Sequence, residues 1–185
     1  MPWLLVTAAV AILLIRYASP WYALVPAALI VLLYLVFRDP HRSVPSIALG
    51  VFSPVDGEVV SVDQIERGES GEAALQVIIR VNSLGTYTAR SPVEGTIREL
   101  ATKALWLETD EGDNVVLKFS GYRFGLAPLA FAKFGERLGQ GQRCAYLRLT
   151  RTAEVQIPVN GKVLAVPGQT LVAGTDIIGN VPSPR

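Results

Sequence analysis

The stretch Pro-Val-Asp-Gly-Glu-Val at residues 54–59 returns twice in this 185-residue chain, as Pro-Val-Glu-Gly-Thr-Ile at 92–97 and as Pro-Val-Asn-Gly-Lys-Val at 158–163. Proline fixes one backbone angle, and Asp, Asn or Gly tolerates the positive φ of tight turns, so each copy predicts a turn. A second repeat, glycine followed by five residues and glycine, relates residues 135–141 to 168–174. The two repeats together predict a compact β barrel or sandwich with two similar halves.

Short apolar runs that alternate with polar residues surround these repeats. They predict β-strands at residues 59–62, 75–81, 115–119 and 155–157, and residues 86–88 continue the β-type composition. Residues 122–134 are expected to hold a short helix or a turn, because Pro128 limits any helix there. The sequence therefore predicts a mainly β domain over residues 51–185.

The N-terminus has a different composition. Two apolar runs, at residues 3–15 and 21–37, are separated by residues 16–20, and Arg16 is the only charged side chain before Arg38. A membrane span needs about 20 apolar residues. Residues 1–37 are therefore expected to form a membrane helical hairpin, either as two short transmembrane helices or as a monotopic insertion. A cleaved signal peptide is disfavoured because no basic segment precedes the first run. Residues 38–50 then form a juxtamembrane linker.

Composition excludes several classes of protein. Half of the residues are hydrophobic, the formal net charge is +1, and all sixteen acidic residues lie at or beyond Asp39. The β domain is balanced in charge, so nucleic-acid binding is not expected. The single cysteine, Cys144, excludes an intrachain disulfide and is read as a small core residue. The single histidine, His41, makes a histidine-based triad or a multi-histidine metal site improbable, and no metal is expected.

Several motifs, in order along nearly the whole chain, resemble those of the short bacterial phosphatidylserine decarboxylases. They are Arg-Asp-Pro-His-Arg at 38–42, Ser-Pro-Val-Asp-Gly at 53–57, Arg-Ser-Pro-Val-Glu-Gly-Thr at 90–96, the segment 135–149, and the tail with Pro158 and residues 168–174. This resemblance implies a barrel-sandwich hybrid of the biotinyl/lipoyl type. It also implies a role in phospholipid metabolism at the bacterial inner membrane. The positive-inside rule places the β domain on the cytoplasmic side if the hairpin spans.

The chemistry that the resemblance implies depends on a pyruvoyl group. In that family the proenzyme cuts itself at a Gly-Ser bond after the serine hydroxyl attacks the preceding carbonyl. Elimination from the resulting ester leaves a pyruvoyl group, which forms a Schiff base with the substrate amine and accepts electrons as carbon dioxide leaves. An Asp-His pair assists the self-cleavage, the histidine as base and the aspartate as its orienting partner.

The residues of this chain depart from that pattern. The family aspartate is present as Asp56, but Tyr87 stands at the histidine position, and Thr150-Arg151 stand where Gly-Ser is expected. No Gly-Ser dipeptide occurs anywhere in the sequence. Tyrosine, with a reference pKa near 10, is a poor base at neutral pH. We therefore expect no pyruvoyl cofactor, and Asp56 can equally serve the turn, because Glu94 and Asn160 fill the equivalent repeat positions.

Three functions remain open from the sequence. The first is an unprocessed pseudoenzyme that binds a phospholipid, with an anionic headgroup near Arg38, Arg42 and Arg90, or a protein partner at the membrane. The second is an active decarboxylase that processes itself at Thr150 by a variant route. The third is a structural module that binds a protein, or a second copy of itself, and ignores lipid.

Overall fold

The structure, a computed structural model, describes residues 2–17, 24–82, 84–101, 104–122 and 126–182. They form two compact units that divide between Arg38 and Asp39, a helical unit and a β unit. Residues 39–50, which the sequence assigns to a linker, belong to the β unit.

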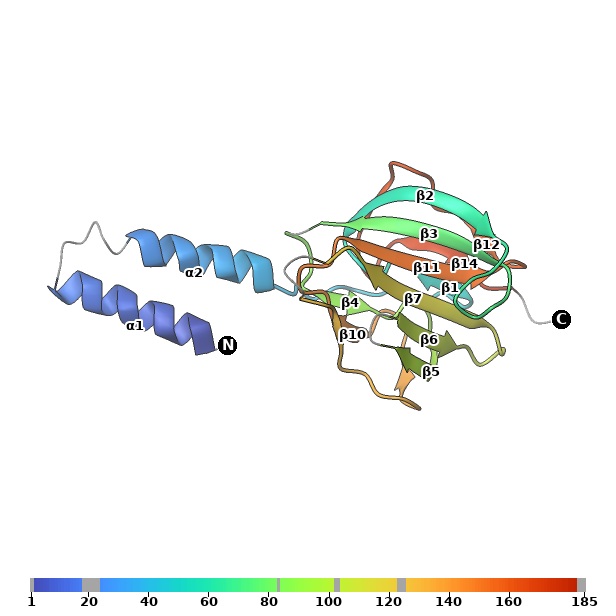
Figure 1. Cartoon of the computed structure of the whole chain (residues 1–185), viewed down its shortest axis with the longest axis horizontal. Helices are drawn as coiled ribbons and strands as arrows, with labels where there is room; N and C mark the ends of the chain where they lie inside the picture. Colours follow the sequence, from blue (N-terminus) through green and yellow to red (C-terminus); the bar gives the residue numbers. More distant parts are fainter. Residues whose placement is uncertain (1, 18–23, 83, 102–103, 123–125, 183–185) are drawn as a thin grey trace. The chain divides into compact units, whose positions relative to one another are not determined.

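The helical unit consists of α1, Pro2–Tyr17, and α2, Leu24–Phe37, which lie side by side (Figure 1). Apolar side chains on both helices face outward, and Leu5 and Val25 are 76% and 73% exposed. No helix in the described part of the chain is both long and apolar enough to cross a membrane. The transmembrane helix expected from the sequence is thus not found among these residues. The last three residues of the predicted connection, 18–20, and the first three of the second apolar run, 21–23, lie outside the described residues.

The β unit contains three antiparallel sheets (Figure 1). The largest has the order β13-β2-β3-β11-β7-β6-β5-β9, and two smaller sheets have the orders β1-β14-β12 and β4-β10-β8. The strands are β1 Gly50–Phe52, β2 Gly57–Ile65, β3 Ala74–Val81, β4 Thr88–Arg90, β5 Gly95–Ala101, β6 Ala104–Glu108, β7 Asn114–Ser120, β8 Leu129–Ala130, β9 Arg137–Leu138, β10 Arg143–Tyr146, β11 Thr152–Pro158, β12 Lys162–Val163, β13 Thr170–Leu171 and β14 Ile177–Asn180. The mainly β prediction and the four predicted strands are confirmed.

The two sequence repeats bind each other in matching pairs. In one half, Gly174 N–H donates to Ser53 O at 2.8 Å and Gly168 N–H donates to Val59 O at 2.8 Å. In the other half, Gly141 N–H donates to Ser91 O at 2.9 Å and Gly135 N–H donates to Ile97 O at 2.9 Å. Each of the first two Pro-Val-x-Gly copies is thus closed by one copy of the glycine repeat. All four of these glycines have positive φ, between 69° and 84°, which explains why glycine stands there.

Glycine stands in the Pro-Val-x-Gly copies for a different reason. Gly57, Gly95 and Gly161 are not among the positive-φ glycines. A Cβ atom at Gly57 would lie 2.1 Å from Arg80 O, and one at Gly95 would lie 2.5 Å from Glu108 O. The positive φ predicted for these turns is therefore wrong. Glycine is needed there because the backbone of a neighbouring strand comes too close for any side chain.

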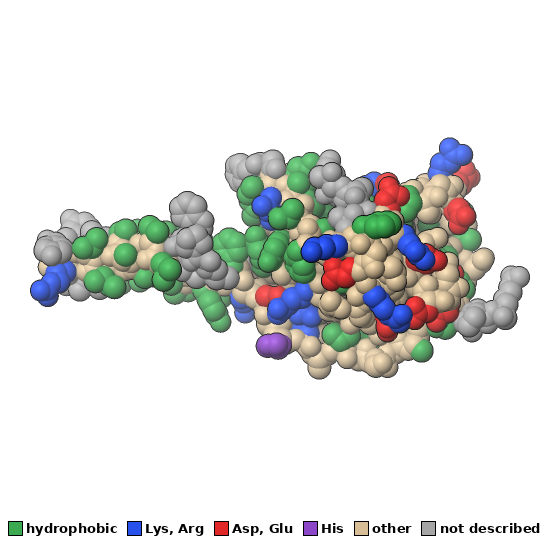
Figure 2. Space-filling model, turned by 90° about the horizontal axis from the view of Figure 1, so that it is seen from below, with side chains coloured by type: hydrophobic (Ala, Val, Ile, Leu, Met, Phe, Trp, Pro, Cys, Tyr) green, Lys and Arg blue, Asp and Glu red, His purple; other side chains and the backbone are tan. Residues whose placement is uncertain are grey.

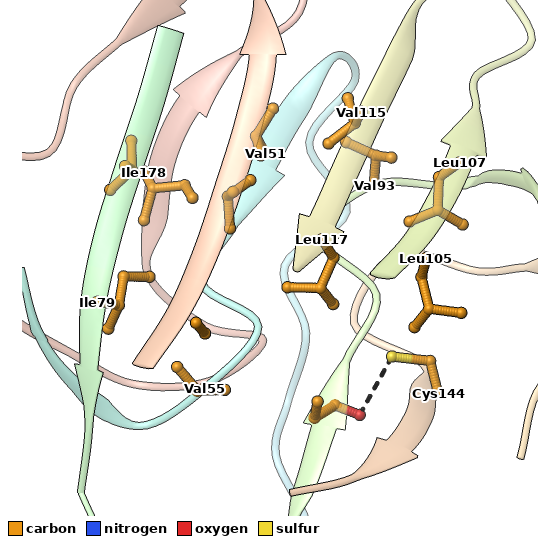
Figure 3. Close-up of a cluster of buried hydrophobic side chains, with 14 of the residues drawn as sticks. Val51, Val55, Ile79, Val93, Leu105, Leu107, Val115, Leu117, Cys144 and Ile178 are labelled. Atoms are coloured by element: carbon orange, nitrogen blue, oxygen red, sulfur yellow. Dashed lines mark hydrogen bonds between the residues drawn. The ribbon is translucent and has the colours of Figure 1, made fainter. Parts of the chain in front are cut away.

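The core lies between the sheets and contains valines from the first two repeats. Val55 and Val93 are 0% and 3% exposed, and Figure 3 shows them among buried side chains of the large sheet such as Leu117. The third repeat differs, because Val159 is 38% exposed. The sulfur of Cys144 lies in this core and donates a weak hydrogen bond to Ala89 O at 3.5 Å (Figure 3). The sequence interpretation of Cys144 as a core residue is confirmed.

For residues 122–134 the sequence predicts a short helix or a turn, and the helix is not found among the described residues. These residues contain the short strand β8 instead. The N–H groups of Phe131 and Ala132 both donate to Cys144 O, at 3.1 and 3.3 Å. The backbone of this segment is therefore used for pairing with β10, and it cannot close helical hydrogen bonds at the same time.

Residues 39–49, which we call the strap, lie along the β unit ahead of β1. The side-chain amide of Gln140 donates to Ile47 O and Gly50 O at 3.1 and 2.7 Å. Val44 lies so close to Gly141 that a Cβ on this glycine would come within 2.5 Å of the valine side chain. The strap is therefore held against the turn between β9 and β10.

Candidate functional site

The carboxylate of Asp56 joins three segments of the β unit. Its Oδ1 accepts a hydrogen bond from Ala173 N–H at 2.8 Å, and its Oδ2 accepts one from Thr86 N–H at 3.0 Å. The same Oδ2 lies 2.9 Å from the Arg42 guanidinium in an ion pair, with the Asp56 side chain only 13% exposed. The carboxylate thus ties the strap to the segment before β4 and to the loop after β13. Glu94, at the equivalent repeat position, is instead an exposed partner of Arg137.

A second carboxylate, Asp39, binds the first residue of the strap to the small β4-β10-β8 sheet. Its Oδ2 accepts a hydrogen bond from the Thr88 hydroxyl at 2.8 Å and lies 2.6 Å from Arg143 Nε. Its Oδ1 lies 3.6 Å from the guanidinium of Arg90. The chain therefore enters the β unit at β4 and β10.

Arg90 is buried at the centre of this charged cluster, with 6% of its surface exposed. Its Nη1 donates to Gly141 O at 3.0 Å and its Nη2 donates to Pro40 O at 3.3 Å. Burial lowers the pKa of Arg90, while the negative charge of Asp39 opposes this shift. Gly174 provides the space, because a Cβ there would lie 2.8 Å from the Arg90 side chain.

The segment at the family's processing position is a tight turn between β10 and β11. Thr150 N–H donates to Leu147 O at 3.1 Å, and the Thr150 hydroxyl donates to the same oxygen at 2.5 Å. Arg148 has a φ of +53°, a left-handed conformation that is uncommon for any residue except glycine. Thr150 is 5% exposed, whereas the Arg151 side chain is exposed. The hydroxyl proton of Thr150 is thus donated to Leu147 O.

The structure brings the family positions together. The carbonyl of Tyr87 accepts a hydrogen bond from Leu147 N–H at 2.9 Å, so residue 87 lies beside the turn that ends at Thr150. Its neighbour Thr86 is bound to Asp56. The half-buried Tyr87 ring lies next to the ring of Tyr146, with centroids 5.6 Å apart. Positions 56, 87 and 150 therefore lie on segments that are hydrogen-bonded to one another.

The predicted lipid-binding residues are divided between the units. Arg38 is an exposed residue of the helical unit, whereas Arg42 and Arg90 belong to the β unit. His41 is exposed on the strap. Sequence reasoning did not identify Asp39 and Arg143 as members of this cluster. An aspartate between Arg38 and Arg42 was the available signal, since a carboxylate there would repel a lipid phosphate unless it had its own cation.

The residues present do not fit a pyruvoyl group. Position 151, where the family's serine would become this group, carries an exposed arginine, and the neighbouring hydroxyl of Thr150 is held by Leu147 O. Arginine has no hydroxyl that could form the ester intermediate. Among the described residues, no three His, Cys, Asp or Glu side chains are grouped to bind a metal ion.

Two known proteins are similar to nearly the whole of this chain. The phosphatidylserine decarboxylase proenzyme of Nitrosomonas europaea is 30% identical to this chain, over 90% of this chain and 86% of that protein. The phosphatidylserine decarboxylase proenzyme of Symbiobacterium thermophilum is also 30% identical, over 97% of this chain and 94% of that protein. The chain belongs to the phosphatidylserine decarboxylase family, which is pyruvoyl-dependent.

Two other comparisons complete this result. No family model matches the chain. Among solved structures, the glucose permease IIA of Mycoplasma capricolum is similar, with a TM-score of 0.52 and 15% identity over 71% of this chain and 94% of that one. At this identity the likeness concerns the fold alone, and it agrees with a mainly β unit.

Removing the Asp56 carboxylate should destabilise the β unit. Asp56→Ala leaves two backbone N–H groups and the Arg42 guanidinium without their acceptor, so we expect the free energy of unfolding to fall by about 3 kcal/mol. Chemical denaturation followed by circular dichroism measures this change. The matched control is Asp63→Ala on β2, an exposed aspartate, for which we expect a change below about 0.5 kcal/mol. Equal denaturation midpoints for the two variants would contradict a structural role for Asp56.

Proposed function

We propose that this chain is a membrane-associated, unprocessed member of the phosphatidylserine decarboxylase family that binds phospholipid without decarboxylating it. The hydrogen bond from the Thr150 hydroxyl to Leu147 O is the observation that carries the proposal. It supports an intact chain because the proton of the Thr150 hydroxyl is donated to a carbonyl oxygen, which is not a base that could remove it. The residue that follows it, Arg151, cannot supply a substitute nucleophile.

The base needed for self-cleavage is also replaced. Tyr87 carries a phenol at the position of the family's histidine, and the phenol is a weak base near neutral pH. The carboxylate of Asp56, which would orient a histidine, is instead bound to Arg42 at 2.9 Å. These replacements argue against the alternative in which Thr150 starts a variant processing route. Without processing, the chain has no electron sink for the carboxylate of the substrate.

The remaining charged cluster supports binding of an anionic headgroup. It contains three guanidinium groups, from Arg42, Arg90 and Arg143, against the two carboxylates of Asp39 and Asp56. The Nε atoms of Arg42 and Arg90 are buried, and within the described residues they have no hydrogen-bond acceptor. A phosphate oxygen is a suitable acceptor for such groups. We place the headgroup at these two arginines of the β unit.

Membrane association is proposed from the helical unit. Its two helices carry exposed leucine and valine side chains and a single charged residue, Arg16, and Figure 2 shows their hydrophobic surface. By contrast, Lys and Arg lie beside Asp and Glu over the β unit (Figure 2). Together with the family membership, this supports a location at the bacterial cell membrane, and we propose that the β unit lies on its inner face.

Intact-mass spectrometry of the purified chain is the direct test. We expect one unbroken species of 20.0 kDa and no release of carbon dioxide from phosphatidylserine. Two fragments that meet at the Leu149–Thr150 bond, with a carbonyl at the new N-terminus that reacts with hydrazides, would overturn the proposal. Thr150→Ala is the matched control, because it should abolish such fragments if the threonine produces them.

Flotation with vesicles tests the lipid part of the proposal. The chain is expected to float more completely with vesicles containing phosphatidylserine than with neutral vesicles, and Arg38→Ala/Arg42→Ala should reduce this preference about tenfold. A chain that floats equally with both vesicles would contradict headgroup recognition. It would favour the third reading, a module that binds a protein.

A further inference from the structure

Four side chains on the small β4-β10-β8 sheet and beside it form an apolar surface, which we call the aromatic face: Tyr87, Leu129, Phe131 and Tyr146. The rings of Phe131 and Tyr146 lie 4.9 Å apart and those of Tyr87 and Tyr146 lie 5.6 Å apart. Leu129 pairs with Tyr146 across the strands β8 and β10. The face is therefore continuous.

The aromatic face is open to solvent although its side chains are large and apolar. Leu129, Phe131 and Tyr146 are 49%, 41% and 40% exposed. The other side of this small sheet is buried, since Cys144 and Ala145 on β10 are 0% and 1% exposed. The sheet thus has one face in the core and a second apolar face outside. Contiguous apolar surface on a monomer commonly marks a site of interaction with a protein or a membrane.

The segment that carries most of this face is rich in basic residues, and two of them, Arg137 and Arg143, form ion pairs with carboxylates outside it. Residues 121–151 contain six of the seventeen Lys and Arg residues but only one of the sixteen acidic residues, Glu136. Arg148 lies directly beside the face, because its Nη1 donates to Ala127 O at 3.3 Å, two residues before Leu129. A second copy of the chain is a poor occupant, since a symmetric contact would bring two positive segments together. The charge favours an anionic partner.

The position at which the chain joins the β unit indicates which class of anionic partner to expect. Asp39, the first residue of the β unit, is held by Thr88 on β4 and by Arg143 on β10. The residues that follow the apolar helix α2 therefore join the same sheet that carries the aromatic face. Tyrosine and phenylalanine beside arginine are typical of the lipid headgroup region, where a ring is buried and a polar group stays in water.

We propose that the aromatic face lies on an anionic lipid bilayer, with Arg148 and Lys133 on its phosphates. This inference rests on the proposed membrane association of the helical unit and adds the surface of the β unit that contacts lipid. Apolar area and basic charge act together in such interfacial binding, so each is expected to be necessary.

Site-directed spin labelling of the full chain tests the inference. Leu129→Cys carries the label on the face, Val60→Cys on β2 is the control at a similarly exposed strand position, and Leu32→Cys reports on α2. The native thiol does not interfere, because Cys144 is fully buried and burial raises its pKa to about 12. The chain is reconstituted in vesicles with roughly 30% phosphatidylglycerol, in neutral phosphatidylcholine vesicles, and in detergent.

We expect the label at position 129 to lose access to a water-soluble nickel reagent about fivefold on the anionic vesicles, while the label at position 60 keeps its access. Arg148→Gln/Lys133→Gln should restore most of this access.

If the label at position 129 stays in water while the label at position 32 enters lipid, the inference is wrong and membrane association stands. If both labels stay in water, the proposed membrane association also fails. Equal protection on neutral vesicles, or protection in detergent that rises with protein concentration, would also overturn the inference, the latter in favour of a second copy.

Discussion

Gly57→Ala is expected to lower the free energy of unfolding by about 4 kcal/mol, a large part of the stability of a domain of this size. A Cβ atom at position 57 would lie 2.1 Å from Arg80 O and 3.0 Å from Ile79 Cγ2. Both contacts are made with β3, which pairs with β2 in the large sheet. The backbone must therefore separate at this point, and the hydrogen bonds on either side are strained with it. Chemical denaturation followed by circular dichroism measures the loss.

Gly139→Ala is the matched control for this substitution. Gly139 does not have a positive φ, and the nearest atom to its added Cβ would be Gln142 Oε1 at 3.5 Å, an ordinary contact. We expect a change below about 0.5 kcal/mol. If Gly57→Ala does not fold at all, Gly95→Ala provides a milder form of the same test, because its Cβ would meet Glu108 O at 2.5 Å. A Gly57→Ala protein as stable as the Gly139→Ala protein would refute the close-approach explanation of the repeat.

The glycines also indicate how far the sequence specifies this fold. Alternation of apolar and polar residues is a local signal, and it correctly predicted the strands β2, β3, β7 and β11. The repeats were visible as spacing, but spacing does not reveal which copy pairs with which. The need for glycine at position 57 comes from a carbonyl on another strand, so no local rule separates it from the need for positive φ at position 168.

In the site, too, the sequence identifies single residues but not their contacts with distant segments. Family motifs located Asp56, Tyr87 and Thr150 from the sequence, and the structure adds that positions 56 and 87 are joined through Thr86. The pairing of Arg42 with Asp56 could not be predicted, because it depends on the course of the strap over the β unit. The sequence assigns residues 38–42 to a juxtamembrane linker, with Arg38 and Arg42 expected near a lipid headgroup. Two of these residues, Asp39 and Arg42, instead form ion pairs within the β unit.

Self-cleavage is expected to return when the three replaced family positions are restored together, as Tyr87→His/Thr150→Gly/Arg151→Ser. The Tyr87 carbonyl is hydrogen-bonded to Leu147, so an imidazole at this position would start beside the turn that holds the new serine. Asp56 lies one residue away through its bond to Thr86 and could orient the imidazole. The cleaved fraction should rise from zero to about half of the chains, with fragments of residues 1–150 and 151–185 in the mass spectrum.

Two further variants separate the roles in this experiment. Thr150→Gly/Arg151→Ser, which keeps Tyr87, should cleave about a hundredfold more slowly, since a general base commonly contributes that factor. Adding Arg42→Gln to the triple variant should speed cleavage, because the Asp56 carboxylate would no longer be shared with a guanidinium 2.9 Å away. A triple variant that keeps its denaturation midpoint and yet stays uncut, with or without Arg42→Gln, would mean that the three replacements are not what keeps this chain intact. The cause would then lie in the turn itself, where the left-handed Arg148 and the backbone hydrogen bond from residue 150 N–H to Leu147 O set the direction of the carbonyl to be attacked.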